Sequence, residues 1–185
     1  MTKLHAWFAL TSRARHEKAV AENLRSKGLE SFLPLYRARR RWTDRIQSVD
    51  LPLFPGYVFC RFTYANRLPV LNTPGVMSVV GFSEEPIPVT DDEISRIRTI
   101  QASGLPSQPW PYVRVGQRAR IEWGSLAGLE GVLIREKHAL RVVVSVELLR
   151  RAVAVEIDRD MIRAVEGAEH AAMASVYLTG QRPRH

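Results

Sequence analysis

The stretch from Pro52 to Phe62, PLFPGYVFCRF, has an unusual pattern of apolar positions. Strand alternation after the Pro55-Gly56 break divides its side chains into two sets. One set is Tyr57, Phe59 and Arg61, and the other is Val58, Cys60 and Phe62. A half-buried strand is apolar on one side, whereas this strand is largely apolar on both. The pattern predicts that Val58 and Phe62 lie in the core. It leaves open whether the chain itself or a partner covers the other face.

The rest of the first hundred residues predicts an α+β unit spanning residues 1–104. Strands are predicted over residues 5–11, 31–36, 57–62 and 76–80, a helix over 15–27 and a short helical turn over 66–71. Thr90 and Glu93 form a capping box before a helix that ends near Gly104, with isoleucines at three-residue spacing. Residues 37–50 are polar and rich in arginine, which indicates a long hairpin or a loop.

A second unit follows a proline-rich segment. GLPSQPWP holds three prolines and no charge, and it predicts a linker over residues 105–112. Residues 113–165 then alternate short β-rich runs with glycine turns, which predicts a small β-barrel. The valine run 142–144 favours strands, although helix formers in the same region leave a helical hairpin open. A tail over 166–185 is predicted to hold a short helix near residues 171–177.

The charge balance points to a polyanionic partner. Lys and Arg total 27 against 19 acidic residues, which gives a net charge of +8. Only four of the 27 are lysines, and the arginine fork suits phosphates. This balance favours nucleic acid or an acidic protein surface, although arginine-rich coding is an alternative explanation. The single cysteine excludes an internal disulfide, the apolar runs are too short to span a membrane, and no secretory signal is evident. We therefore expect a cytoplasmic monomer.

The chain shows no pattern typical of an enzyme. Its five histidines are scattered, and neither a phosphate-binding loop nor a dinucleotide fingerprint is present. Asp91, Asp92 and Glu93 are explained by the start of a helix, where acidic side chains are favourable. We therefore expect no enzymatic activity, no metal and no cofactor.

Longer motifs carry a resemblance to a known family. GSLAGLEGVLIRE and its flanking strands resemble the KOW module. WFALTSR, FPGYVFCRF and NTPGVMSVVGF, in that order, resemble the NGN domain of the NusG family. Together these motifs cover residues 1 to about 165. The phrases around the barrel are more similar to the specialised RfaH-like paralogues than to the housekeeping factor.

The resemblance implies a transcription elongation and antitermination factor. An NGN domain of this kind binds the clamp helices of the largest RNA polymerase subunit, closes the clamp and suppresses pausing or termination. The residues implied in clamp binding are Phe54, Tyr57 and Phe59. Those implied in contact with the second-largest subunit are Asn66, Arg67 and Asn72.

Further sites are implied for nucleic acid and for a second protein. Residues near the non-template DNA strand are Arg13, Arg15, His16 and Lys18, and those implied for upstream duplex DNA are Arg40 and Arg41, next to Trp42. In the KOW module, Leu148 and Leu149 are predicted to be exposed and to bind a small-subunit ribosomal protein or Rho. The alternative function is a KOW-type RNA- or ribosome-binding protein without polymerase contact.

Overall fold

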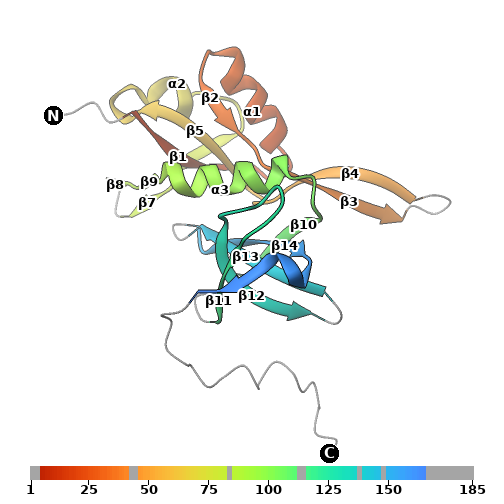
Figure 1. Ribbon diagram of the computed structural model, residues 1–185. Helices are drawn as coiled ribbons and strands as arrows, with labels where there is room; N and C mark the ends of the chain where they lie inside the picture. The colour runs from red at the N-terminus through yellow and green to blue at the C-terminus, as the bar shows by residue number, and fades with distance from the viewer. Residues whose placement is uncertain are drawn as a thin grey trace, which may run out of the picture.

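A five-stranded antiparallel sheet organises the first half of the chain in the computed structural model (Figure 1). The structure describes residues 5–41, 46–82, 85–111, 116–136, 139–146 and 149–165. The strand order is β2-β5-β1-β6, and β9 also pairs with β1. The strands are β1 (His5–Ser12), β2 (Glu30–Phe32), β5 (Tyr57–Thr63), β6 (Val76–Val79) and β9 (Pro88–Val89). The predicted strand over residues 57–62 thus lies at the centre, between β1 and β2.

Helix α1 (Glu17–Ser26) covers one face of this sheet. Its buried residues Val20, Ala21 and Leu24 belong to one apolar cluster with Phe8, Leu10, Val58, Cys60 and Phe62. The short elements η1 (Tyr64–Asn66) and α2 (Leu68–Leu71) add Val70 to the same cluster. The prediction that Val58 and Phe62 lie in the core is confirmed, since they are 0% and 2% exposed.

Helix α3 (Asp91–Ala102) covers the opposite face. The predicted capping box is present: Thr90 Oγ1 accepts from the Glu93 N–H at 3.2 Å, and the Thr90 N–H donates to Glu93 Oε2 at 3.2 Å. The three isoleucines of the predicted stripe, Ile94, Ile97 and Ile100, are buried against the sheet residues Trp7 and Phe59 in a second apolar cluster. The spacing of these isoleucines therefore correctly indicated the buried side of the helix.

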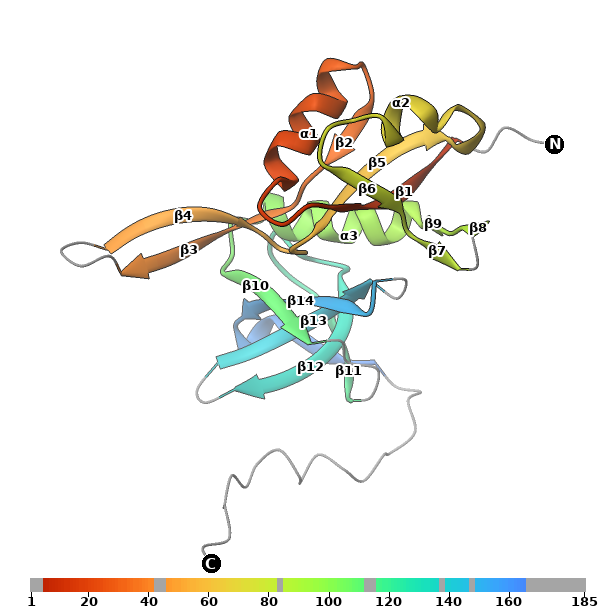
Figure 2. The same cartoon turned by 180° about the vertical axis from the view of Figure 1, so that it is seen from behind.

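A two-stranded hairpin projects from the first sheet (Figures 1 and 2). It consists of β3 (Leu35–Arg41) and β4 (Ile46–Pro52), paired from Leu35↔Pro52 to Arg41↔Ile46. This agrees with the predicted hairpin over residues 37–50, but the predicted strand 31–36 is divided between β2 and β3. A smaller hairpin joins β7 (Gly81–Phe82) and β8 (Glu85–Pro86).

A six-stranded antiparallel sheet lies beyond α3, with the order β10-β14-β13-β12-β11-β15. Its strands are β10 (Ser107–Pro111), β11 (Arg118–Ile121), β12 (Glu130–Glu136), β13 (Ala139–Val146), β14 (Arg151–Ile157) and β15 (Ile162–Ala164). A 3-10 turn, η2 (Arg159–Met161), precedes β15. The β-rich runs predicted within residues 113–165 contain strands β11 to β14 of this sheet.

Most of the predicted linker is a strand rather than a connection. Residues 107–111 pair with β14 from Ser107↔Val155 to Pro111↔Arg151. The composition was misleading because proline is compatible with an edge strand, and β10 lies at one edge of its sheet. Trp110 anchors this strand by packing against Val143, Ala152 and Ala154.

Some predictions concern parts of the chain that lie outside the described residues. These are the tail over 166–185, with its helix near 171–177, and the side chains of Trp42 and Leu148. Within the ranges given above, no helix is long and apolar enough to cross a membrane. The same ranges contain no group of three or more His, Cys, Asp or Glu side chains that could hold a metal ion.

Removing the N-terminal cap of α3 is expected to destabilise the protein. Thr90→Ala leaves the Glu93 N–H without its side-chain acceptor, which costs about 1 kcal/mol in the free energy of unfolding. Urea denaturation monitored by circular dichroism measures the change. Thr99→Ala in the same helix is the control, because the Thr99 hydroxyl donates only to the Ser95 carbonyl inside the helix, at 3.0 Å. Equal losses in the two variants would contradict a specific role for the cap.

Candidate functional site

The second face of β5 carries a set of aromatic rings contributed by neighbouring strands and by the turn before β5. Phe59 lies opposite Ala9 of β1 and Phe32 of β2. The Phe54 ring meets the Phe59 ring edge-on, with centroids 5.7 Å apart, and the Phe32 ring lies 6.1 Å from Phe59. Tyr57 packs against the same cluster. We call these four residues, Phe32, Phe54, Tyr57 and Phe59, the aromatic face.

The aromatic face is not an open depression in this arrangement. Phe54 and Phe59 are only 1% and 0% exposed, whereas Tyr57 is half-buried. The isoleucines of α3 belong to the same apolar cluster, and that cluster continues into the second sheet through residues such as Leu129 and Val146. The question left open by the sequence is thus answered for this arrangement: the chain itself covers Phe54 and Phe59, two of the three residues implied in clamp binding.

The second sheet and the loop before β12 pack against α3. A cleft of about 440 Å³ lies there, lined by Asp92, Ser95, Arg96 and Thr99 of α3, by residues 127–129 of the loop before β12 and by Glu130 at the start of β12. Leu149 also joins the shared apolar cluster and is 6% exposed, which contradicts its predicted exposure. The next residue, Arg150, is exposed and has a φ of 49°. The predicted turn thus presents an arginine to solvent and directs a leucine inward.

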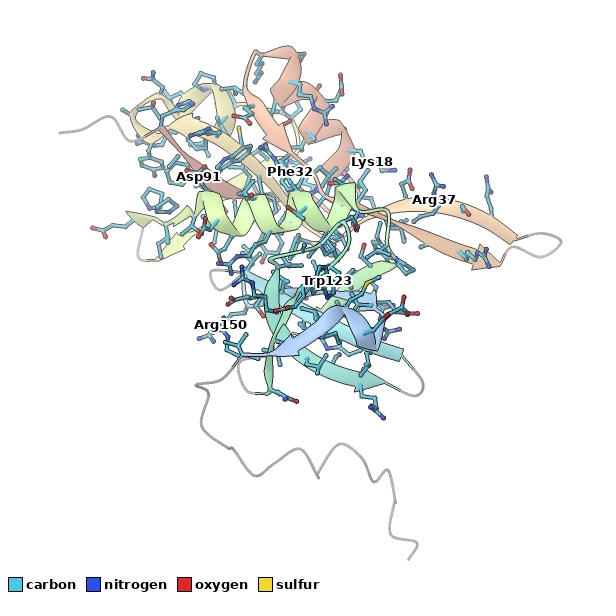
Figure 3. The ribbon with its side chains drawn as sticks, viewed as in Figure 1. Lys18, Phe32, Arg37, Asp91, Trp123 and Arg150 are labelled. Carbon is cyan, nitrogen blue, oxygen red and sulfur yellow. The ribbon has the colours of Figure 1, made fainter. Side chains whose placement is uncertain are left out.

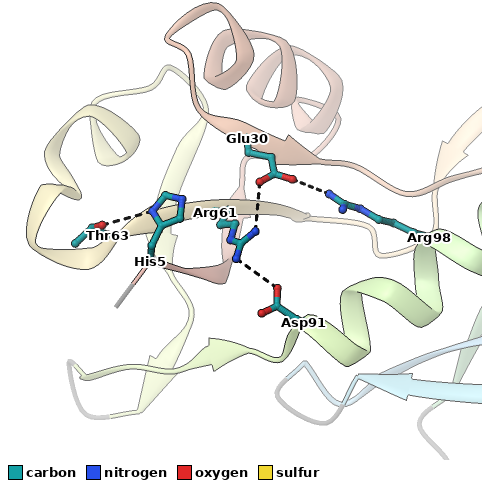
Figure 4. A network of polar contacts seen from close by, with 6 residues as sticks. All are labelled: His5, Glu30, Arg61, Thr63, Asp91 and Arg98. Carbon is teal, nitrogen blue, oxygen red and sulfur yellow. Dashed lines mark hydrogen bonds and ion pairs between the residues drawn. The ribbon is translucent and has the colours of Figure 1, made fainter. Parts of the chain in front are cut away.

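Ionic contacts follow one margin of the aromatic face (Figure 4). Glu30 on β2 accepts from Arg98 of α3 at 3.0 Å and lies 3.9 Å from Arg61 of β5. Arg61 also lies 3.9 Å from Asp91, at the start of α3. The Arg98 guanidinium stacks on the rings of Trp7 and Phe32, at 4.9 and 5.2 Å from their centroids. Exposed ion pairs contribute little to stability individually. The stacking of Arg98 on Trp7 and Phe32 is therefore the main stabilising contact along this margin.

The predicted basic residues of the β1–α1 turn are brought together at the surface. These are Arg13, Arg15, His16 and Lys18, and all four are exposed. We call them the basic turn. Backbone contacts fix it on both sides: the Arg13 N–H donates to the Gly75 carbonyl and the Ser12 N–H to the Gly56 carbonyl, both at 2.9 Å. The buried Glu17 carboxylate accepts from the Gly56 N–H at 2.8 Å.

Gly75 is required beside the basic turn. Its φ is 93°, and a Cβ atom there would lie 2.8 Å from Val20 Cγ2 on α1. A larger residue would push the loop away from the helix, which explains why this position is glycine. The geometry can hold the cationic side chains Arg13, Arg15 and Lys18, with His16 beside them, at a defined place on the surface, where the three charges can neutralise phosphates.

The hairpin adds further positive charge. Arg37 and Arg39 are exposed, and Arg37 lies 3.7 Å from Asp50 across the two strands. Figure 3 shows Arg37 on the hairpin and Lys18 on α1, on the same side of the protein. The backbone of Arg40 and Arg41 belongs to β3, but their side chains lie outside the described residues, as do those of Trp42 and Arg45.

The three polar residues predicted to contact a second subunit flank α2. Asn66 and Asn72 are exposed, and the Arg67 guanidinium lies 4.8 Å from the Tyr64 ring centroid. Lys27 Nζ holds this segment by donating to the Pro69 carbonyl at 2.9 Å and to Thr73 Oγ1 at 2.8 Å. Sequence reasoning missed two apolar neighbours, Leu68 and Met77, which are 64% and 65% exposed. Met77 lies on β6, an edge strand of its sheet, and the sequence alone does not show which strand lies at an edge.

Another exposed side chain that the sequence did not single out is Trp123 (Figure 3). It is 68% exposed in the loop that follows β11. In the motif GSLAGLEGVLIRE, by contrast, Leu126 and Leu129 are buried, at 1% and 5% exposure. Large exposed aromatic side chains are candidates for contact with partners.

Cys60 carries no reactive thiol. It is fully buried on the α1 side of β5, and burial, with a smaller effect of the Glu30 charge, raises its pKa to about 12. The thiolate, which is the nucleophile, is therefore disfavoured in the folded protein.

The raised pKa predicts a specific pH dependence of stability. Below pH 9, the ordinary value, the thiol is protonated in both folded and unfolded chains. Between pH 9 and 12 only the unfolded chain loses the proton, so the free energy of unfolding falls by about 1.4 kcal/mol per pH unit from this group. Urea denaturation at pH 8 and pH 10 measures the loss.

The matched control is Cys60→Ala at the same two pH values. Because other groups titrate in this range, the Cys60 contribution is the difference between the two proteins. Cys60→Ala should lose less stability than the parent on going to pH 10. Identical losses would show that burial does not hold the thiol protonated.

Known proteins share both the sequence pattern and the fold described above. A family model described as "Transcription termination factor nusG" matches residues 5–98. The transcription termination/antitermination protein NusG of Lactococcus lactis subsp. lactis (strain IL1403) is 28% identical over 174 residues, which cover 86% of this chain and 93% of that protein. The protein of the same description from Streptomyces virginiae is 27% identical over 191 residues, and the match covers 85% of this chain and 62% of the relative.

A solved structure is similar over nearly the same range. The structure described as "Domain interaction in Thermotoga maritima NusG" has a TM-score of 0.56 at 22% identity. The match covers 88% of this chain and 98% of that one. At this level of identity the likeness concerns the fold, a mostly β structure with few helices.

Proposed function

The chain belongs to the NusG family, and from this premise we propose that it is a transcription termination or antitermination factor that acts on RNA polymerase. The observation that carries the proposal is the family match over residues 5–98, together with relatives of that activity aligned over more than four fifths of the chain. The finer role is that of an elongation factor that suppresses pausing, with an RfaH-like specialisation. It is not an enzyme, and it acts as a monomer in the cytoplasm.

The polymerase contact proposed for the NGN part, residues 1–104, is the aromatic face. A hydrophobic hot spot with a tyrosine at its margin suits the apolar side of a helical pair such as the clamp helices. Phe54 and Phe59 are buried in the present arrangement, so this contact requires the elements that cover them to move. The half-buried Tyr57 is the residue of the three that a partner can reach first.

The effect on transcription follows from differential binding. A factor that binds the closed clamp more tightly than the open clamp shifts the polymerase toward the closed, elongating state. Asn66, Arg67 and Asn72 are proposed to contact the second-largest subunit, so that the factor bridges the cleft. The exposure of both asparagines beside Leu68 supports this role, because a polar rim around an apolar residue is typical of transient interfaces.

Nucleic acid is proposed to lie along the basic turn and the hairpin. The basic turn would approach non-template DNA, and Arg40 and Arg41 would approach the upstream duplex. The second sheet is proposed to be a KOW module that recruits a ribosomal protein or Rho. Its strand pairing supports a start at residue 107 rather than 113. Within the described part of that module, Trp123 is a more accessible candidate for this contact than the buried Leu149.

Truncation of Tyr57 is expected to weaken binding to core RNA polymerase. If the aromatic face is the hot spot, Tyr57→Ala in the full chain should raise the dissociation constant about 30-fold, which corresponds to about 2 kcal/mol. Binding of the purified variant to core polymerase, measured by biolayer interferometry, tests this.

Leu29→Ala is the matched control for general loss of packing. Leu29 is also partly buried, but it packs against the cluster on the α1 side of the sheet. Its binding should remain within about twofold of the parent. Undiminished binding of Tyr57→Ala would exclude the aromatic face as the contact, and absence of polymerase binding by the parent chain would overturn the proposed function itself.

Neutralising the basic turn is expected to reduce the salt dependence of DNA binding. Removing one phosphate contact lowers the slope of log K against log salt by about 0.7 on a single strand. The double variant Arg13→Gln, Lys18→Gln should therefore reduce the slope by about 1.4. Fluorescence anisotropy with a single-stranded oligonucleotide at several salt concentrations measures it.

Arg25→Gln provides the control on the same helix. Arg25 is exposed but already forms an ion pair with Glu22, so it has less charge available for a phosphate. A reduction of about 0.7 in this single variant, the same loss per charge removed, would mean that binding depends on total charge. That result would exclude the basic turn as a defined nucleic-acid site.

A further inference from the structure

The turn that leads into β5 carries Phe54 and Tyr57, two of the residues proposed to contact polymerase, at its two ends. The Tyr57 N–H donates to the Phe54 carbonyl at 3.1 Å, which closes a four-residue turn. Pro55 at the second position and a φ of 85° at Gly56 are features of a type II turn. A type I turn differs mainly in the orientation of its central peptide group, here the one between Pro55 and Gly56. A contact that fixes this peptide group therefore selects the form of the turn.

Hydrogen bonds, and not packing, hold Gly56 in place. A Cβ atom placed on it would meet nothing within 4 Å. Its N–H donates to Glu17 Oε1 at 2.8 Å, and its carbonyl accepts from the Ser12 N–H at 2.9 Å. Because the Gly56 N–H belongs to the central peptide group of the turn, the contact with Glu17 fixes the orientation of that group.

Glu17 is an acidic residue within a cationic stretch of the sequence. It lies between His16 and Lys18 of the basic turn, but it is 6% exposed, whereas both neighbours are exposed. It begins α1, where a negative charge is favourable and where the N-cap residue His16 makes no capping hydrogen bond with its side chain. The Glu17 carboxylate is thus directed to the turn before β5 and is not presented to solvent with the cationic side chains.

The basic turn itself requires support. Arg15 has a φ of 65° and is one of two non-glycine residues with a positive φ in the described part of the chain. Such a conformation is strained and persists where the surroundings fix the backbone. The His16 N–H donates to the Arg13 carbonyl at 3.0 Å, and the next residue, Glu17, attaches the turn to Gly56. Glu17 therefore lies at the junction of the basic turn and the turn that ends at Tyr57.

We propose that Glu17 is a positioning residue that fixes the basic turn and Tyr57 relative to each other, through the hydrogen bond that it accepts from Gly56. Its role depends on the reach of the side chain rather than on its charge. The consequence for polymerase and DNA rests on the proposed function, because Tyr57 and the basic turn are the surfaces assigned to these partners. With Glu17 in place, both partners meet one rigid unit.

Two substitutions separate reach from charge. Glu17→Gln keeps an acceptor oxygen at the same distance from the backbone but removes the negative charge. Glu17→Asp keeps the charge but is shorter by one methylene group, so its carboxylate no longer reaches the Gly56 N–H. Amide hydrogen exchange, measured by NMR on the isolated protein, reports on this hydrogen bond. Exchange at Gly56 should be about tenfold faster in Glu17→Asp and within about twofold of the parent in Glu17→Gln.

Glu22→Asp is the matched control. Glu22 lies on the same helix, is exposed, and forms an ion pair with Arg25. It loses the same methylene group at a place remote from Gly56, so exchange at Gly56 should equal that of the parent. Neither polymerase nor DNA is present, and failure of the positioning role is therefore distinguishable from failure of the proposed function.

Binding of a single-stranded oligonucleotide separates positioning from charge by the direction of the change. Displacement of the basic turn in Glu17→Asp should cost one phosphate contact, which lowers the affinity about fivefold at about 0.1 M salt. Glu17→Gln should bind at least as tightly as the parent. If charge alone mattered, Glu17→Asp would bind like the parent and only Glu17→Gln would differ. Fluorescence anisotropy measures the affinities.

A double-mutant cycle tests the link to Tyr57. Glu17→Asp should raise the dissociation constant for core polymerase about fivefold in the parent chain. In a chain that also carries Tyr57→Ala, the same substitution should raise it less than about twofold, because the side chain that it positions is already truncated. Biolayer interferometry measures all four proteins.

Three results would overturn the positioning role. One is unchanged exchange at Gly56 in Glu17→Asp. The second is equally accelerated exchange in Glu17→Gln or in Glu22→Asp, which would indicate a role of charge or general destabilisation of α1. The third is an equal effect of Glu17→Asp on polymerase binding in the presence and in the absence of the Tyr57 ring.

Discussion

The burial of both faces of β5 is the constraint on which the rest of this structure depends. A central strand with apolar residues on both sides needs two covering layers. Helix α1 supplies one layer, and its valine and leucine positions pack against Val58 and Phe62. Helix α3 supplies the other against Phe59, and its own apolar cluster extends into the second sheet. The first sheet therefore lies between α1 and α3, because both faces of its central strand are apolar.

This arrangement makes the aromatic face part of the core and also a potential interface. An apolar surface cannot be covered by its own chain and by a partner at once, so the two states compete for the same contacts. The ionic margin contributes little to that competition, because its pairs are mostly exposed. The apolar contacts that Phe54 and Phe59 make within the shared cluster are therefore the main cost of exposing this surface.

Local features of this fold could be predicted from the sequence, whereas the partners of each face could not. The capping box at Thr90 and the isoleucine stripe are encoded within one helix, so they were recognised correctly. Alternation in β5 divides Phe59 from Phe62 but does not say what covers either one, because that depends on residues far away in the chain. Leu149 was expected at the surface for the same reason. The proline-rich segment was interpreted as a linker because composition does not reveal that Trp110 has a sheet to pack against.

Glycines with positive φ have different surroundings beside the basic turn and in the connection after α3. At Gly56 and Gly75 the backbone groups donate to Glu17 and accept from β1 or its following turn, and Val20 closes the space beside Gly75. These glycines fix the basic turn rigidly, as suits a surface that must present charges at set positions. Gly104 has a similar φ but no such neighbours. The same backbone conformation is therefore held by hydrogen bonds at Gly56 and Gly75, whereas a Cβ atom at Gly104 would meet nothing within 4 Å.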